Sequence, residues 1–374
     1  MHGSLARFFG TAAIAAVAAL AWPAADAASQ QLTIAGNIPL TGPASSFAGN
    51  YFKSLEMGYD DGCKEQGISP CPFKIDAQDN QAKAQEAVTI AQKQLLAKPS
   101  IYVSGLSTQS RAVLPEVDKS PIPHLLVAFD SFMAQRGENR IRLLPNYKIE
   151  APMYVNYVKS KGAKRVFGTG LSLAAATEQF GSLIEPEVKK MGAAYQLEQF
   201  EVSAKDYNTI ALKAKEFNPD VILLNGLSFN VYPLIKAFRT QGLTDKVISC
   251  MDFVDLLYNN TPRDDLKGVT FITPIFEIPG AVPSAPAWRA QWAAKHGKQP
   301  SFVDAYAYDT GRILAAAFKK GGGKVTVESI RSVLPFKGVA GDIQLDADKD
   351  IIATLGYARI NDKGEVEAVK VAGM

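Results

Sequence analysis

The sequence predicts an α/β fold built on parallel β-sheets, and two observations carry that prediction. Short apolar runs alternate with amphipathic stretches from residue 32 to residue 128, and the same alternation begins again near residue 151. Repeated strand–helix–strand units form right-handed crossovers within a parallel sheet. The 374 residues are long enough for two such sheets, each with its own core.

The first set of elements runs from residue 32 to residue 128. Strands are expected at 32–38, 73–76, 101–104 and 122–128, and helices at 48–64 and 81–98, with a further helical stretch before the last strand. In the helix at 81–98 one face is shared by Ala84, Val88, Ala91 and Leu95, and Pro99 stops the helix.

The second set repeats this pattern, and the last third of the chain then departs from it. Helices are expected at 151–161, 174–191, 207–217 and 231–241, alternating with strands at 165–168, 196–202, 221–225, 247–251 and 269–273. Beyond them lie helical patterns at 287–296, 303–319 and 327–334, followed by short strands at 343–345, 354–360 and 366–371. The sequence shows no internal repeat.

Composition and charge exclude several classes of protein. The chain is 47% apolar and 21% charged, which is ordinary for a globular protein and argues against a disordered chain or one with several membrane spans. The formal net charge is +3 and the two signs are interspersed, so no nucleic-acid partner is expected. Three histidines and three cysteines disfavour a multi-histidine metal site and a disulfide-dense scaffold.

Residues 1–27 are expected to form a secretory signal peptide. Residues 11–22 are apolar but too few to cross a bilayer, which takes about 20 residues, and Ala25-Asp26-Ala27 offers the small residues that signal peptidase requires. No cysteine follows the cleavage site, which disfavours a lipid anchor. The mature chain is therefore expected to be a soluble exported protein.

Export permits disulfide bonds, and the chain offers one close pair of cysteines. Cys63 and Cys71 lie eight residues apart in a segment that contains Gly and Pro, and we expect them to pair. Cys250 ends an apolar run and is expected to be a small buried residue rather than a nucleophile.

The motifs of catalysis and cofactor binding are incomplete or missing. Gly168-Thr-Gly170 follows a strand, but Leu173 occupies the third glycine position of a dinucleotide fingerprint. Gly321-Gly-Gly-Lys324 suggests a phosphate loop, but Val325 stands where Ser or Thr would hold Mg²⁺. The sequence has no Gly-x-Ser-x-Gly elbow, His-Glu-x-x-His or Cys-x-x-Cys motif. We therefore expect no enzyme activity, no cofactor and no metal.

Several strings, in order along the chain, resemble landmarks of one family. They are Ile38-Pro-Leu-Thr-Gly-Pro43, Asp79-Asn-Gln-Ala-Lys-Ala84, Val103-Ser-Gly-Leu-Ser-Thr108, Asn218-Pro-Asp-Val-Ile222 and Ala305-Tyr-Ala-Tyr-Asp309. The family that they resemble is that of the branched-chain amino acid binding proteins, the type I periplasmic receptors of ABC importers. The likeness covers nearly the whole mature chain.

This resemblance implies two Rossmann-like lobes joined by a hinge of three chain segments. The N-terminal lobe would comprise residues 28–146 and 275–346, and the C-terminal lobe residues 147–274 and 347–374. A receptor of this kind is a monomer in the periplasm that binds a small-molecule ligand between its lobes, closes on it and delivers it to an ABC permease of the inner membrane.

The resemblance also implies which residues contact the ligand. The positions that match are Phe47, Ser107, Thr108, Ala128, Phe129, Asp130, Leu171, Ser172, Phe229 and Asp252. Ser107 and Thr108 match a hydroxyl loop that grips the ligand carboxylate, with capping of the following helix as the alternative role. Asp252 matches an acidic residue for the ligand ammonium, and its alternative role is also a helix cap. Phe47 matches an aromatic pocket wall, and a place in the core is the alternative.

The ligand expected from these features is a small carboxylate-bearing molecule, and an amino acid comes first. Asp130 stands where the family often has Thr, and Leu171-Ser-Leu173 stands where many members have Tyr followed by Asp. These departures keep an aromatic acid, an amide or a urea-like molecule as the alternative ligand. An exported hydrolase is a more distant alternative, which the missing nucleophile elbow disfavours.

Overall fold

The computed structural model describes residues 1, 31–42, 44–45, 49–135 and 137–371, and residues 31–374 form one compact unit. Phe47 and all but the first residue of the expected signal peptide lie outside the described residues. Within the described ranges, no helix combines the length and the apolar character that a membrane crossing needs.

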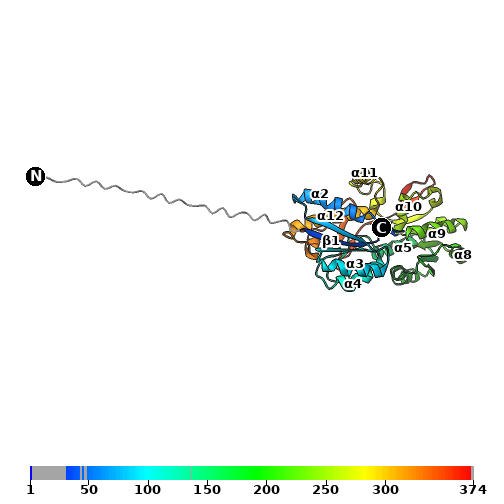
Figure 1. The fold of residues 1–374 in the computed structure, drawn as a ribbon. Coiled ribbons are helices and arrows are strands. Elements are labelled where there is room, and N and C mark those ends of the chain that lie inside the picture. The colour runs from blue at the N-terminus through cyan, green and yellow to red at the C-terminus, as the bar shows by residue number, and fades with distance from the viewer. Residues whose placement is uncertain (2–30, 43, 46–48, 136, 372–374) are drawn as a thin grey trace. The chain divides into compact units, whose positions relative to one another are not determined.

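The first sheet has five parallel strands in the order β2-β1-β3-β4-β5. The strands are β1 (Leu32–Ile38), β2 (Phe73–Asp79), β3 (Ile101–Gly105), β4 (His124–Val127) and β5 (Arg140–Ile141). Helix α2 (Tyr51–Gln66) lies on one face of this sheet, and α3 (Ala84–Leu96) and α4 (Ser107–Val117) lie on the other (Figure 1). Strands β3 and β4 are buried along their whole length because helices cover both faces.

The second sheet has seven strands in the order β15-β14-β10-β9-β8-β6-β7. Its parallel strands are β6 (Arg165–Leu171), β7 (Ala194–Phe200), β8 (Val221–Leu224), β9 (Val247–Ser249) and β10 (Thr270–Pro274), and its antiparallel edge is β14 (Leu355–Ile360) and β15 (Val366–Val369). The longer helices of this region are α5 (Tyr147–Ser160), α8 (Asn208–Phe217) and α9 (Ser228–Thr240). Its shorter helical segments are α6 (Ala174–Glu178), the π-helical η1 (Gln179–Ile184), α7 (Glu185–Lys190), η2 (Thr244–Lys246), η3 (Met251–Val254), α10 (Asp255–Tyr258), η4 (Arg263–Leu266) and η5 (Ile275–Glu277).

The last third of the chain returns a long helix to the first sheet. It contains α11 (Ala285–His296), α12 (Phe302–Lys320), α13 (Val327–Ser332) and a small sheet of β11 (Phe336–Lys337), β12 (Asp342–Leu345) and β13 (Ile351–Ile352). Helix α12 packs beside α2 (Figure 1). A Cβ added at Gly58 would lie 2.0 Å from the Tyr308 carbonyl oxygen, and one at Gly311 would lie 2.4 Å from that of Leu55. Glycine at these two positions therefore lets the two helix backbones touch.

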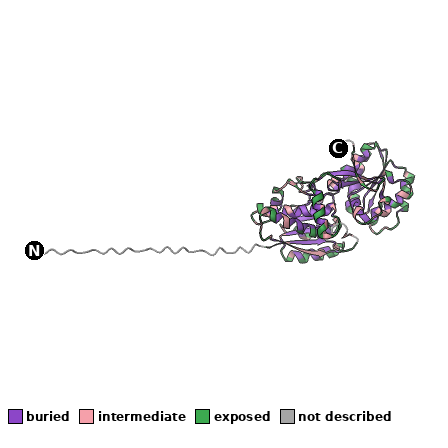
Figure 2. Cartoon of the chain, turned by 90° about the horizontal axis from the view of Figure 1, so that it is seen from above, coloured by how far each residue is buried: buried purple, intermediate pink, exposed green. Residues whose placement is uncertain are grey.

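The predicted fold class is confirmed: the structure has two largely parallel α/β sheets between which the chain passes three times. The first passage follows β5, the second follows β10, and the third lies between β12 and β14. The buried residues concentrate on the strands and on the inward faces of the helices (Figure 2). One local prediction differs from the structure, because the helix expected at 174–191 contains the π-helical η1. The strand at 343–345 belongs to the small sheet with β11 and β13, and the strand at 354–360 pairs antiparallel with β15.

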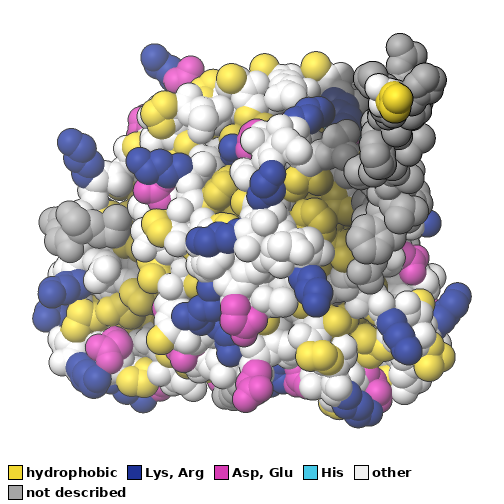
Figure 3. All heavy atoms as spheres, turned by 90° about the vertical axis from the view of Figure 1, so that its left-hand side faces the viewer, with side chains coloured by type: hydrophobic (Ala, Val, Ile, Leu, Met, Phe, Trp, Pro, Cys, Tyr) yellow, Lys and Arg dark blue, Asp and Glu magenta, His cyan; other side chains and the backbone are white. Residues whose placement is uncertain are grey.

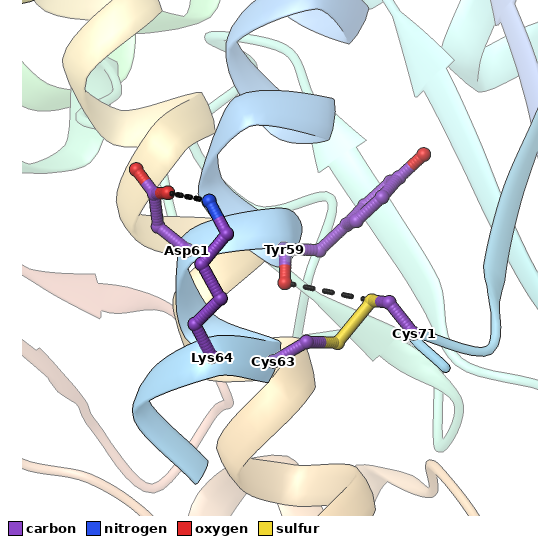
Figure 4. The surroundings of a disulfide bond; sticks show 5 residues. All are labelled: Tyr59, Asp61, Cys63, Lys64 and Cys71. Carbon is purple, nitrogen blue, oxygen red and sulfur yellow. Dashed lines mark hydrogen bonds and ion pairs between the residues drawn. A yellow bond between two sulfur atoms is a disulfide. The ribbon is translucent and has the colours of Figure 1, made fainter. Parts of the chain in front are cut away.

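A disulfide bond joins the end of α2 to the segment that leads into β2. Cys63 and Cys71 are its two residues, and their Cα atoms are 5.7 Å apart (Figure 4). Nearby, Lys64 pairs with Asp61 at 3.0 Å, and the Cys71 sulfur lies 3.6 Å from the Tyr59 carbonyl oxygen (Figure 4). Cys250 is free and buried.

The charged surface agrees with the interspersed charges of the sequence. On the face shown in Figure 3, Lys and Arg side chains are dispersed among Asp and Glu rather than gathered in one patch. The described residues also contain no group of His, Cys, Asp and Glu side chains arranged to hold a metal ion.

Candidate functional site

A cavity of about 670 Å³ lies at the carboxyl ends of parallel strands from both sheets. The loops after β1, β2, β3 and β4 supply one part of its wall, and the loops after β6, β7 and β8 supply the other. In parallel α/β sheets this edge is where ligands bind, because loops and helix N-termini converge there. The residues that line the cavity include Ser107, Thr108, Arg111, Ala128, Phe129, Tyr147, Leu171, Leu173, Leu227 and Phe229.

Three of the helices that begin at this cavity have leucine at the position before the first turn. Leu106 precedes α4, Leu173 precedes α6 and Leu227 precedes α9. A leucine side chain cannot accept a hydrogen bond, and in the described part of the chain no side chain caps these three helix starts. Their first N–H groups are therefore available to a ligand, and the positive end of the helix dipole favours an anion.

The two predicted hydroxyl residues form the first turn of α4. Ser107 and Thr108 both line the cavity. The Ser107 hydroxyl also accepts a hydrogen bond of 3.1 Å from the backbone N–H of Asp130. This bond ties the start of α4 to the loop after β4, so that two predicted contact loops support one another.

Arg111 is a residue of the cavity wall that sequence reasoning missed. It forms an ion pair with Asp130, whose side chain is only 4% exposed, whereas the Arg111 side chain is 45% exposed and lines the cavity. Among the described lining residues Arg111 is the one that carries a full charge. The signal for it was its place four residues after Ser107, which puts both on one face of a helix.

Asp130 does not itself line the cavity in the described structure. One of its carboxylate oxygens accepts from the backbone N–H of Phe132 at 3.1 Å, and the other pairs with Arg111. An unpaired acid at this position would repel a ligand carboxylate. The ion pair prevents this, because Arg111 neutralises the buried charge and itself lines the cavity.

The rest of the wall is mainly apolar. Phe129 and Tyr147 stack with ring centroids 5.4 Å apart, and the Tyr147 backbone N–H donates to the Phe129 carbonyl oxygen at 3.0 Å. Leu171 and Phe229 face the same cavity from the second sheet, together with Leu173, Leu227 and Ala128. No described lining residue is Asp or Glu. The cavity thus suits an apolar body that carries an anionic group.

Two further predicted contacts, besides Asp130, lie away from the described cavity wall. The Ser172 hydroxyl donates to Glu201 at 2.6 Å instead. Asp252 lies in η3 and is only 3% exposed, and no described group bonds its Oδ2. Burial, with Asp255 and Glu150 nearby, raises the pKa of the Asp252 carboxyl well above its usual value. Both residues follow strand ends as expected, but a strand end does not determine where a side chain points.

A buried chain of hydrogen bonds leads from the cavity wall into the core of the second sheet. The Tyr147 hydroxyl donates to Asn225 at 3.4 Å, and the Asn225 amide donates to Gln179 at 2.9 Å. Gln179 donates to one carboxylate oxygen of Glu150 at 2.7 Å, and the Met251 backbone N–H donates to the other at 2.7 Å. Burial raises the pKa of Glu150 to about 7, although these two hydrogen bonds oppose the rise.

Comparison with known proteins gives the fold a family. Residues 31–365 match the family described as periplasmic binding protein. No curated protein matches the chain.

Solved structures resemble the chain over nearly its whole length. A leucine binding protein from Thermotoga maritima is 20% identical with a TM-score of 0.77, covering 91% of this chain and 98% of its own. A solute binding protein of an ABC transporter from Rhodopseudomonas palustris BisB5, in complex with 3,4-dihydroxy benzoic acid, is 19% identical with a TM-score of 0.74, covering 92% and 99%. A second protein from R. palustris, in complex with 4-hydroxybenzoate, is 15% identical with a TM-score of 0.78, covering 91% and 96%. The chain therefore belongs to the periplasmic binding protein family, whose members are substrate-binding components of ABC transporters rather than enzymes.

Proposed function

We propose that this protein captures a small apolar carboxylic acid, aromatic or branched aliphatic, and presents it to the permease of an ABC importer. One observation supports this choice above others: the charged residue of the described cavity wall is Arg111, and the remaining wall is apolar apart from hydroxyl and amide groups. An amino acid was the first expectation from the sequence, with an aromatic acid as its alternative. The cavity favours the alternative.

The ligand carboxylate would bind at the start of α4. The free N–H groups of its first turn, the hydroxyls of Ser107 and Thr108 and the guanidinium of Arg111 all border this part of the cavity. Each offers a donor that matches a carboxylate, and a hydrogen bond to a charged group contributes about 1.5–3 kcal/mol. The apolar body of the ligand would then lie against Phe129 and Tyr147.

An α-ammonium group has no counter-charge in this arrangement. The described wall contains no carboxylate, and Asp130 is already paired with Arg111. Desolvation of an unpaired ammonium costs several kcal/mol, which an amino acid would have to recover elsewhere. A ligand with a carboxylate and no ammonium avoids this cost.

The lobes that would close on the ligand follow the two sheets. We propose an N-terminal lobe of residues 28–146 and 275–346 and a C-terminal lobe of residues 147–274 and 347–374. A ligand that contacts both lobes favours the closed population. We also propose that residues 1–27 are removed on export to the periplasm and that the mature protein acts as a monomer. N-terminal sequencing of the exported protein should then begin at Ala28.

The test is a calorimetric titration with matched probes. The compounds 3-phenylpropanoate and phenylalanine differ only in the ammonium group, and benzoate and benzamide differ in the anionic charge. We expect each acid to bind at least about tenfold more tightly than its partner, which corresponds to about 1.4 kcal/mol. Tighter binding of phenylalanine, or of leucine over every acid, would show that the ligand is an amino acid. Tighter binding of benzamide would remove the anion site.

A further inference from the structure

A buried ion pair joins two of the three chain passages between the sheets. Arg142 lies between β5 and α5, and Asp350 lies between β12 and β13. Their side chains are 0% and 1% exposed, with Arg142 Nε 2.8 Å from Asp350 Oδ1 and Nη2 2.5 Å from Oδ2. Asn146, which caps the start of α5, donates its side-chain amide to the same carboxylate at 2.9 Å. The pair thus holds the first and third passages together.

The same guanidinium also holds a loop of the ligand cavity. Arg142 Nη1 donates to the carbonyl oxygens of Ala128, at 3.0 Å, and of Asp130. Its Nη2 lies 3.5 Å from the carbonyl oxygen of Ser131. These three contacts position the backbone of residues 128–131, which carries part of the cavity wall. A planar fork with several fixed donors can do this, whereas a lysine ammonium cannot.

A continuous set of contacts therefore runs from the chain passages to the anion site. Asp350 binds Arg142, Arg142 binds the backbone of Asp130, and the Asp130 side chain binds Arg111 in the cavity wall. An ion pair buried to this degree stabilises a protein little more than apolar residues of similar volume would. What an apolar pair could not supply is the set of donors to the 128–131 carbonyl oxygens.

We propose that Arg142 and Asp350 are positioning residues for ligand binding: they hold loop 128–131 in the geometry in which Asp130 presents Arg111 to the ligand, and they tie this loop to the first and third passages. Neither residue contacts the ligand. The effect on affinity rests on the proposed function, whereas the effect on the loop does not.

Amide hydrogen exchange of the ligand-free protein tests the proposal directly. Asp350→Asn removes the charge that orients Arg142, and Asp346→Asn is the matched control, because Asp346 lies in the same turn and pairs with the half-buried Lys148 at 2.8 Å. We expect exchange of the amides at 126–133 to become about tenfold faster in Asp350→Asn and to stay unchanged in Asp346→Asn. Unchanged exchange at 126–133 in Asp350→Asn, or an equal increase in the control, would overturn the proposal.

A second variant and a second measurement keep the outcome decisive. If Asp350→Asn does not fold, Arg142→Lys replaces it, since lysine keeps the charge but loses the fork, and the same two outcomes apply. Titration with 3-phenylpropanoate should give an affinity about tenfold weaker in the positioning variant than in Asp346→Asn, mainly through faster dissociation. Failure of the wild-type protein to bind any acid would contradict the proposed function, while the exchange result would still decide the role of Arg142 and Asp350.

Discussion

Replacing Glu150 with glutamine should change how the stability of this protein depends on pH. The Glu150 carboxyl is fully buried on α5, and burial raises its pKa from 4.5 to about 7. The folded protein therefore binds a proton here between about pH 4.5 and 7 that the unfolded chain releases. Because the native state binds more protons in this window, the free energy of unfolding falls as pH rises through it. The difference between the two pKa values corresponds to roughly 3 kcal/mol, present in full below pH 4.5 and lost above pH 7.

Glu150→Gln cannot ionise, so this contribution should disappear from its pH profile. A glutamine can still bond Gln179 and Met251, provided that the amides of Gln179 and Asn225 turn over. The free energy of unfolding of Glu150→Gln minus that of wild type should be roughly 3 kcal/mol larger at pH 8 than at pH 4.5.

Urea unfolding followed by circular dichroism at the two pH values measures this difference. Glu187→Gln on α7 is the control, because Glu187 pairs with Lys190 at the surface and its side chain is 49% exposed. An equal stability difference between wild type and Glu150→Gln at both pH values would contradict a raised pKa of Glu150. An equal change in the surface control Glu187→Gln would contradict it as well.

Substitution of two residues of the cavity wall should change ligand affinity, whereas loss of the disulfide should not. Arg111→Met should weaken 3-phenylpropanoate binding about tenfold or more, since a hydrogen bond to a charged group is worth about 1.5–3 kcal/mol. Adding Asp130→Asn to this variant should restore stability but not affinity. An unchanged Kd of Arg111→Met in calorimetry would exclude Arg111 from the site. Phe229 lines both the cavity and a neighbouring hollow of about 630 Å³. Phe229→Ala should therefore shift preference from benzoate to the longer 4-phenylbutyrate, and an unchanged ratio of the two Kd values would contradict this. Cys63→Ser with Cys71→Ser should lower the free energy of unfolding by roughly 2–3 kcal/mol and leave Kd unchanged; a loss of affinity in the folded double variant would show that the disulfide supports the site.

Local patterns in the sequence determined the fold class and the edge of the sheets at which the cavity lies. Strands and helices follow from apolar periodicity and from the residues that stop each element, which are short-range properties of the chain. Ser107 and Thr108 follow β3 after Leu106, and Ala128 directly follows β4, so their place at the carboxyl edge could be predicted. The sequence also indicated part of the apolar cavity wall, namely Leu171 and Leu173, the second of which precedes α6.

Only the tertiary structure decided where side chains point and which charges pair. Asp252 follows a strand end, as Ser107 does, but turns into the core and lies away from the described cavity wall. Arg111 meets Asp130 across 19 residues of sequence, and Arg142 meets Asp350 across 208. Such contacts depend on how sheets and loops pack against one another over the whole chain. Periodicity and propensity describe neighbours along the chain, so they cannot specify partners that only packing brings together.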